Sequence, residues 1–170
     1  MTELDVVAAL LRLWAGTVMI AHGLNHARTQ EGTAKWFASK GFKSPELNAK
    51  VSAASEILIG LGLIAGLLTS AAAAGLAATM LVAFWTIHRF AGFFVFYRPD
   101  EGYEYVATLA VLAFALAIIG PGSASLDAVL GIDGDLDGWT GAAIVGAGLL
   151  LGALQLAAMW RRPVSEDSAS

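Results

Sequence analysis

The sequence predicts an all-α bundle of membrane-spanning helices, and three observations support this. Of 170 residues, 57% are hydrophobic and only 14% are charged, with a mean hydropathy of +0.68, whereas soluble domains are about half apolar and about a quarter charged. Five long apolar stretches alternate with short polar segments. Basic residues gather on alternate connections between those stretches, as they do in polytopic membrane proteins.

The five apolar stretches have lengths suited to crossing a bilayer as helices. A spanning helix takes about 20 apolar residues, because the hydrocarbon core is about 30 Å thick and each residue rises about 1.5 Å. The fourth stretch reaches this length only if Glu104 and Gly120 extend it. The expected spans are residues 6–24, 51–68, 71–90, 105–119 and 140–160.

The second and third stretches lie so close in sequence that their connection has two interpretations. Only Thr69 and Ser70 separate them, so they form either one very long helix or two helices joined by a tight turn. One helix would far exceed the bilayer thickness, which favours the turn. Glycines four residues apart also favour close packing of helices, although glycine is common in membrane helices generally. These pairs are Gly62 with Gly66, and Gly148 with Gly152.

The distribution of charge predicts the orientation of the bundle. With five spans, nine of the ten basic residues share one side, and the tenth, Arg12, lies inside a span. Basic residues favour the cytoplasmic side, so we expect the N-terminus outside and the C-terminus in the cytoplasm. The cytoplasmic set is Arg28, Lys35, Lys40, Lys43, Lys50, Arg89, Arg98, Arg161 and Arg162. The external side carries Glu3, Asp5, Asp127, Asp133, Asp135 and Asp137.

The connections divide the chain into a membrane domain and three smaller parts. We expect a four-helix domain over residues 1–128, an acidic external loop over 129–139, a fifth span over 140–160 and a disordered cytoplasmic tail over 161–170. Residues 33–41 alternate apolar and basic side chains at helical spacing, which predicts an interfacial helix with Trp36 and Phe37 dipping into the membrane. Asp133, Asp135 and Asp137 alternate like calcium ligands, but the rest of a twelve-residue calcium loop is missing, so a solvated turn is expected.

Ionisable residues at membrane depth are the candidates for a functional site, because each costs several kcal/mol unless it is paired or hydrated. Following the predicted topology, most of them gather near the cytoplasmic end of the bundle, with aromatic residues around them. Hydrogen-bonding groups beside an aromatic slot suit a quinone head group. The polar candidates are His22, His26, Glu56, His88, Arg89 and Glu104, and the aromatic lining is Trp36, Phe37, Trp85 and Phe90.

Other interpretations of these residues stay open. Histidines at helix ends are often hydrated interface residues, and aromatic residues at this depth form an ordinary interfacial belt. Glu56 paired with Arg12 or with a histidine would only lock helices together. Histidines with a carboxylate are also a metal-ligand set, and His22 with His88 would be a haem-ligand pair. The sequence assigns no metal and no definite cofactor, and it favours a quinone over the other candidates.

Several chemistries are excluded or unsupported. The chain has no cysteine, so it forms no disulfide, thiolate metal site or dithiol relay. The sequence contains no serine–histidine–acid motif, phosphate-binding loop or zincin helix. The basic side is also the side that faces anionic lipids, so the charge pattern gives no support for nucleic-acid binding.

The chain resembles the DoxX family of small bacterial membrane proteins. The resemblance runs from Arg12 to Asp127, and Glu56 with the segment 120–127 is its most specific part. The matching features are Gly23, the runs 35–37 and 41–42, the run 56–62, Thr69 before the alanine-rich third span, Glu104, and the run 120–127. The resemblance implies a four-helix bundle in a bacterial plasma membrane. The fifth span departs from that pattern.

The resemblance also implies a role beside redox enzymes. The DoxX family takes its name from the small subunit of a thiosulfate:quinone oxidoreductase, and other members are linked with membrane oxidoreductase assemblies. We therefore expect a non-catalytic accessory subunit with membrane lipids and protein subunits as partners, and assign no catalytic residue. A membrane assembly or scaffold protein, and a small transporter or lipid-handling protein, are the alternatives.

Overall fold

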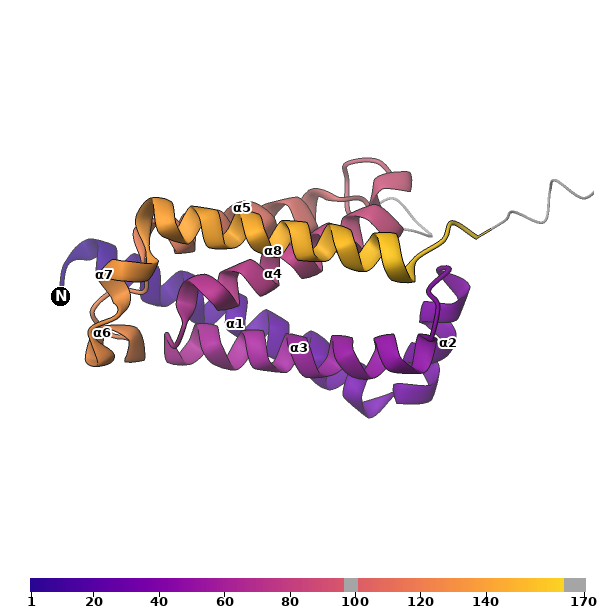
Figure 1. The fold of residues 1–170 in the computed structure, drawn as a ribbon, viewed down its shortest axis with the longest axis horizontal. Helices are drawn as coiled ribbons and strands as arrows, with labels where there is room; N and C mark the ends of the chain where they lie inside the picture. The colour runs from indigo at the N-terminus through magenta and orange to yellow at the C-terminus, as the bar shows by residue number, and fades with distance from the viewer. Residues whose placement is uncertain (97–100, 164–170) are drawn as a thin grey trace, which may run out of the picture.

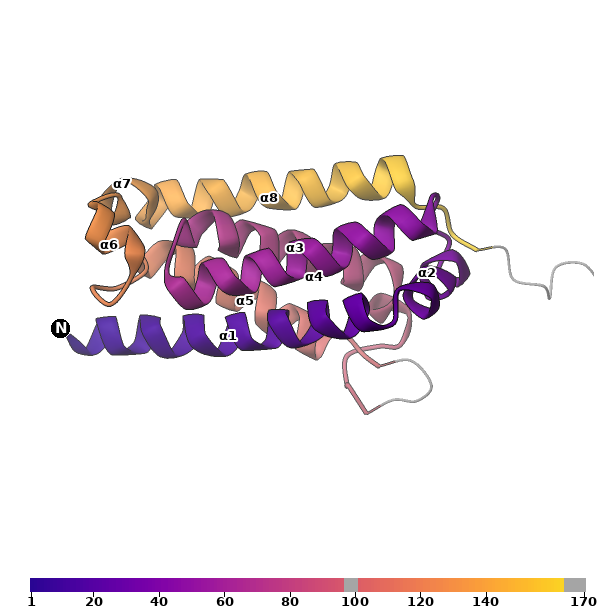
Figure 2. The ribbon, with the colours of Figure 1, turned by 90° about the horizontal axis from the view of Figure 1, so that it is seen from below.

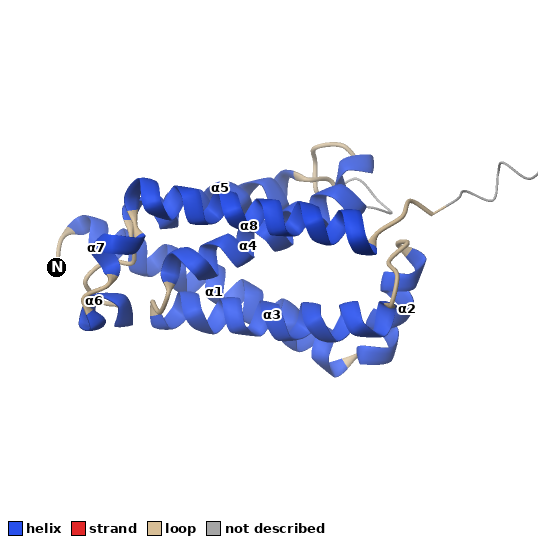
Figure 3. Ribbon diagram, in the orientation of Figure 1, coloured by secondary structure: helices blue, strands red, loops and turns tan. Residues whose placement is uncertain are grey.

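A computed structural model describes residues 1–96 and 101–163, and the chain folds there into helices connected by loops and turns (Figure 3). The long helices α1, α3, α4, α5 and α8 lie along one axis (Figures 1 and 2). One end of the bundle carries the short helix α2, and the other carries α6 and α7; we call these the α2 end and the α6 end. The helices are α1 Glu3–Arg28, α2 Gln30–Ser39, α3 Pro45–Ala65, α4 Thr69–Thr86, the 3-10 turn η1 His88–Phe90, α5 Glu104–Ile119, α6 Leu126–Leu130, α7 Asp133–Leu136 and α8 Gly138–Met159.

The long helices confirm the predicted class, an all-α membrane bundle. Helices α1, α3, α4 and α8 are each long and apolar enough to cross a membrane. Helix α5 is apolar but has 16 residues, which gives about 24 Å at 1.5 Å per residue. It begins at Glu104, as the span length requires, and ends where Gly120 adopts a φ of +82°. Helix α5 is thus the shorter fifth element of the bundle.

The chain turns sharply between α3 and α4, although slightly earlier than predicted. Helix α3 ends at Gly66, which has a φ of +63°, and Leu68 has a φ of +47°. Thr69 and Ser70, expected to form the turn, are instead the first residues of α4. The turn falls at Gly66 because glycine adopts left-handed backbone conformations without a steric penalty.

Small residues let the helices approach closely. A Cβ atom placed on Gly16 of α1 would lie 2.7 Å from the carbonyl oxygen of Gly60 on α3, and one placed on Gly60 would lie 2.6 Å from that of Gly16. Gly148 and Gly152 bring α8 against Ala74 and Ala78 of α4 in the same way. Close backbone contact is a common way for membrane helices to pack. Gly66 serves the turn rather than a helix interface.

Helix α2 differs from its prediction in its bounds and in the position of Phe37. The helix spans residues 30–39 rather than 33–41. Phe37 is 7% exposed and packs edge-on against Phe42, at 4.9 Å between ring centroids. Trp36 is 38% exposed. Phe37 faces the bundle because the following turn brings Phe42 and Ala49 over it, so the prediction that both rings enter lipid was wrong for Phe37.

The α2 end is closed by contacts between the connection after α2 and the end of α8. The backbone N–H of Lys43 donates to Met159 O at 2.7 Å, and that of Arg161 donates to Gly41 O at 2.9 Å. The Trp160 indole N–H donates to Lys40 O at 2.8 Å. The predicted fifth span is thereby tied to the rest of the bundle.

At the α6 end, the acidic segment is more ordered than the solvated turn predicted for it. Residues 133–136 form the short helix α7, directly before α8. The Ser70 hydroxyl donates to Leu136 O at 2.6 Å, which ties this segment to the start of α4. The tail beyond residue 163, predicted to be disordered, lies outside the described residues.

Candidate functional site

A cavity of about 210 Å³ lies between α1, α3, α4 and α5, in the half of the bundle nearer α2. Each of the four helices contributes side chains to it, and α2 and η1 add one each. Its walls are mostly apolar, and α1, α3, α4, η1 and α5 each contribute polar groups. The lining residues are Met19, His22, His26, Trp36, Glu56, Thr79, Met80, Ala83, Ile87, His88, Tyr105 and Val106.

Helical periodicity explains how α1 supplies its part of the wall. Met19, His22 and His26 follow one another at spacings of three and four residues, which places them on one face of a helix. Gly23, on the neighbouring face, lies against Ala53 and Ile57 of α3. Because α1 and α3 touch there, Glu56 of α3 is held beside the histidines of α1.

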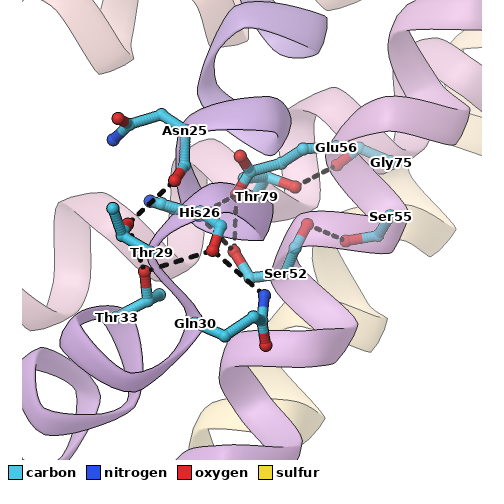
Figure 4. A network of polar contacts seen from close by, with 10 residues as sticks. All are labelled: Asn25, His26, Thr29, Gln30, Thr33, Ser52, Ser55, Glu56, Gly75 and Thr79. Carbon is cyan, nitrogen blue, oxygen red and sulfur yellow. Dashed lines mark hydrogen bonds and ion pairs between the residues drawn. The ribbon is translucent and has the colours of Figure 1, made fainter.

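Glu56 is the most buried polar residue of the cavity, with 4% of its surface exposed. Its Oε1 accepts a hydrogen bond from the Ser52 hydroxyl at 2.5 Å, and the same oxygen lies 3.4 Å from His26 Nδ1. His26 Nδ1 is also 3.2 Å from Ser52 Oγ. Figure 4 shows these three side chains converging between α1 and α3.

The second oxygen of Glu56 has no hydrogen-bond partner. Oε2 is buried, and no donor among the described residues reaches it. A buried polar atom without a partner costs about 1–3 kcal/mol, and more when it carries charge. The cavity therefore contains a hydrogen-bond acceptor that a bound donor would satisfy.

His22 and Tyr105 form the side of the cavity between α1 and α5. Their rings stack at 6.3 Å between centroids, with 27° between the planes. Both side chains line the cavity and are also exposed at the surface of the bundle, Tyr105 to 37%. In a membrane this surface faces lipid, so the cavity approaches the lipid phase between these two helices.

His88 lines the cavity from η1, and one of its nitrogens is engaged. Nδ1 lies 2.6 Å from Glu101 O. Since a carbonyl oxygen only accepts, Nδ1 carries the hydrogen, and Nε2 is the acceptor in the neutral ring. Helix α4 ends at Thr86, and His88 is the first residue of η1, which places it at this end of the cavity.

Four of the six polar residues singled out in the sequence thus line one cavity, and two do not. Arg89 instead lies over the rings of Trp85 and Phe90, at 4.0 and 4.5 Å from guanidinium carbon to ring centroid. Glu104 is the first residue of α5. Among the predicted aromatic residues Trp36 lines the cavity, whereas Phe37, Trp85 and Phe90 do not.

Three polar residues of the site, Ser52, Thr79 and Tyr105, were missed by sequence reasoning. Ser52 precedes Glu56 by one helical turn, and this spacing was a usable signal, since residues four apart on a helix face each other. Tyr105 carried no such signal, because its position beside His22 depends on how α5 packs against α1. Among residues 1–96 and 101–163, no group of three or more His, Asp or Glu side chains is placed to hold a metal ion.

Arg12 does not pair with Glu56, one of the alternatives left open by the sequence. It is 1% exposed and lies toward the α6 end, where its guanidinium donates to Leu63 O at 3.2 Å and to Ala124 O at 2.7 Å. On α3, the partner of Arg12 is Leu63, which lies two turns after Glu56. The two charged groups therefore serve different sites.

The described helices and their cavity at membrane depth define a polytopic α-helical membrane protein. Residues 7–89 match the DoxX family model, so this part of the chain is similar to the DoxX family. The matched segment includes Glu56, Ser52 and all three histidines; Tyr105 and helix α8 lie outside it. Comparison with curated proteins and with solved structures gave no match.

Proposed function

We propose that the chain is an accessory subunit of a quinone-linked oxidoreductase assembly in a bacterial plasma membrane, and that its cavity binds a quinone head group. The observation that carries this proposal is the buried Glu56 carboxylate, whose Oε2 lacks a donor. Intramembrane ionisable residues that persist without a full set of partners commonly mark ligand or proton sites. A quinol hydroxyl is a donor of the kind this oxygen needs.

The dimensions and walls of the cavity suit a head group better than a whole lipid. Its volume of about 210 Å³ lies below the range of about 300–1,000 Å³ for sites that enclose drug-sized ligands. Met19, Met80 and Val106 supply apolar contacts for a ring. An isoprenoid tail would leave past His22 and Tyr105, where the cavity approaches lipid.

The hydrogen-bonding groups favour the reduced form of the ligand. Glu56 Oε2 is an acceptor, and Nε2 of a neutral His88 is another, because its Nδ1 donates to Glu101 O. A quinol has two hydroxyl donors at opposite ends of its ring, whereas a quinone has only acceptors. We therefore expect tighter binding of quinol than of quinone.

An accessory role fits the composition of the chain. With no cysteine, it supplies no thiolate for sulfur transfer or disulfide exchange. In this proposal a partner subunit carries the reaction, and this chain holds the lipophilic ligand at the membrane. The predicted orientation, with the α2 end in the cytoplasm, would place the head-group site near the cytoplasmic surface.

Photolabelling tests the proposal. Purified protein is irradiated with an azido-substituted short-chain ubiquinol, and labelled peptides are identified by mass spectrometry. We expect labelling of α1 or α5 near His22 and Tyr105, competed by unlabelled ubiquinol and reduced at least about tenfold in Glu56→Gln, as loss of a hydrogen bond to a charged group of about 1.5–3 kcal/mol implies. Glu104→Gln, outside the cavity, is the control. Equal labelling of the wild type and Glu56→Gln would refute the head-group site.

A specific observation also favours a second candidate, a non-catalytic assembly protein. The contacts of His26 with Ser52 and Glu56 join α1 to α3, so these groups serve helix packing on this interpretation. It predicts that Glu56→Gln and His26→Ala lower the melting temperature and leave ligand labelling unchanged. Measuring both properties on the same variants separates the two candidates.

A further inference from the structure

We propose that Ser52 and His26 form a proton relay between Glu56, inside the cavity, and water at the α2 end. The inference rests on the proposed function in one respect: the cavity ligand gives the proton to Glu56 or takes it from there. The relay itself consists of three side chains that lie between two hollows.

The three side chains form a continuous hydrogen-bonded path. Ser52 Oγ lies 2.5 Å from Glu56 Oε1, and His26 Nδ1 lies 3.2 Å from Ser52 Oγ. A direct approach of 3.4 Å between His26 Nδ1 and Glu56 Oε1 runs beside it. A hydroxyl both donates and accepts, so Ser52 can take a proton from the carboxyl while passing its own to the imidazole.

His26 reaches from the cavity to the surface. Its side chain is 22% exposed, whereas that of Glu56 is 5% exposed. It lines the cavity and also a surface depression of about 260 Å³ at the junction of α1 and α2. The other residues of this depression are Asn25, Thr29, Gly32, Thr33 and Trp36. The imidazole therefore connects a buried acid to a polar, accessible hollow.

The net result of the transfer is that one proton moves from the ligand to water. A ligand hydroxyl gives its proton to Glu56 Oε2, and the carboxyl group turns about its last bond to present that proton to Ser52. Ser52 accepts it and passes its own proton to His26 Nδ1. His26 then releases a proton from Nε2 to water, which leaves the ring as its Nδ1–H tautomer. Proton exchange of the imidazole with water returns it to the Nε2–H tautomer and restores the starting state. No electron moves within this sequence.

Other titratable groups face the cavity and define the controls. His22 from α1, His88 from η1 and Tyr105 from α5 all line it. None of them lines the outer depression, and among the described residues Glu56 has its polar contacts with Ser52 and His26. They therefore test whether proximity to the cavity is enough, or whether the specific path through Ser52 and His26 is required.

Infrared spectroscopy of hydrogen–deuterium exchange tests the relay without any ligand. The carboxylic C=O band that disappears in Glu56→Gln is assigned to Glu56, at a pH low enough for that band to be present. Its shift after transfer to D2O gives the exchange rate. We expect exchange to slow at least about tenfold in His26→Ala and Ser52→Ala, a conservative value for loss of an acid–base group. Imidazole added to His26→Ala should restore the rate.

Two controls make the result decisive. His22→Ala removes a cavity histidine outside the path, and Ser55→Ala removes a hydroxyl that bonds only to the backbone of Ser52; both should exchange at the wild-type rate. Wild-type exchange in His26→Ala, equal slowing in His22→Ala, or slowing that imidazole does not reverse would each overturn the relay. Ser52→Ala gives an independent reading if His26→Ala fails to fold. Failed quinol labelling with an intact exchange result would count against the proposed function alone.

Discussion

Arg12 and Asp127 stabilise opposite sides of one turn. The Arg12 guanidinium donates to the carbonyl oxygen of Leu63 in the last turn of α3, and the Asp127 carboxylate accepts from the backbone N–H groups of Leu68 and Thr69, at 2.6 and 2.8 Å, where α4 begins. The cation thus meets the negative end of one helix dipole and the anion meets the positive end of the next. Both residues are at most 2% exposed.

This arrangement predicts a large stability loss when the Asp127 carboxylate is removed. Asp127→Ala would leave the N–H groups of Leu68 and Thr69 without an acceptor, at about 1–3 kcal/mol each. We expect a clearly lower melting temperature in detergent. Asp135→Ala, at an exposed position of α7, should melt within about 0.5 kcal/mol of the wild type. Equal melting temperatures for the two variants would contradict the role of Asp127.

A second prediction concerns the contact between α1 and α3. In Gly60→Ala the new methyl group would lie 2.6 Å from Gly16 O, which forces the two backbones apart. We expect destabilisation of about 1–3 kcal/mol, typical of overpacking, and disturbance of the cavity, because α1 and α3 form part of its wall. Gly146→Ala on α8 is the matched control, since nothing lies within 4 Å of the added carbon. A Gly60→Ala variant as stable as Gly146→Ala would show that the helices are not in close contact.

A third prediction separates ligand binding from packing at Glu56. Glu56→Gln keeps an oxygen that accepts from Ser52, so the loss of stability should stay below about 1 kcal/mol, the net value of a typical hydrogen bond. Quinol labelling should nevertheless be lost. Thermal unfolding and labelling are measured on the same preparation. A variant that unfolds early but labels normally would support the assembly interpretation instead.

The orientation of the bundle gives a fourth prediction, and the absence of cysteine makes it simple to test. Asp135→Cys places a thiol at the α6 end, and Lys35→Cys places one on α2, where the native lysine side chain is 77% exposed. A membrane-impermeant maleimide applied to intact cells should label the first variant and not the second. The reverse pattern would invert the predicted orientation and place the proposed relay at the external surface.

Some features of the site were predictable because they depend on local spacing. His22 and His26 share a helix face, and the order of the spans carries Glu56 and His88 to the same end of the bundle. The positions of Arg89 and Phe37 were not predictable in this way. Arg89 lies over the rings of Trp85 and Phe90 and not in the cavity, and Phe37 turns inward because Phe42 folds back over it.

The sequence by itself determined the class of the protein, because the length and spacing of apolar stretches reflect the thickness of a bilayer and require no tertiary contact. It also determined which polar residues lie at which end, since each span reverses the direction of the chain. Only the tertiary structure decided which of those residues meet. The partners of Glu56 and Arg12 depend on helix rotation and on contacts of a few ångströms between segments far apart in sequence, and hydrophobic periodicity does not specify either.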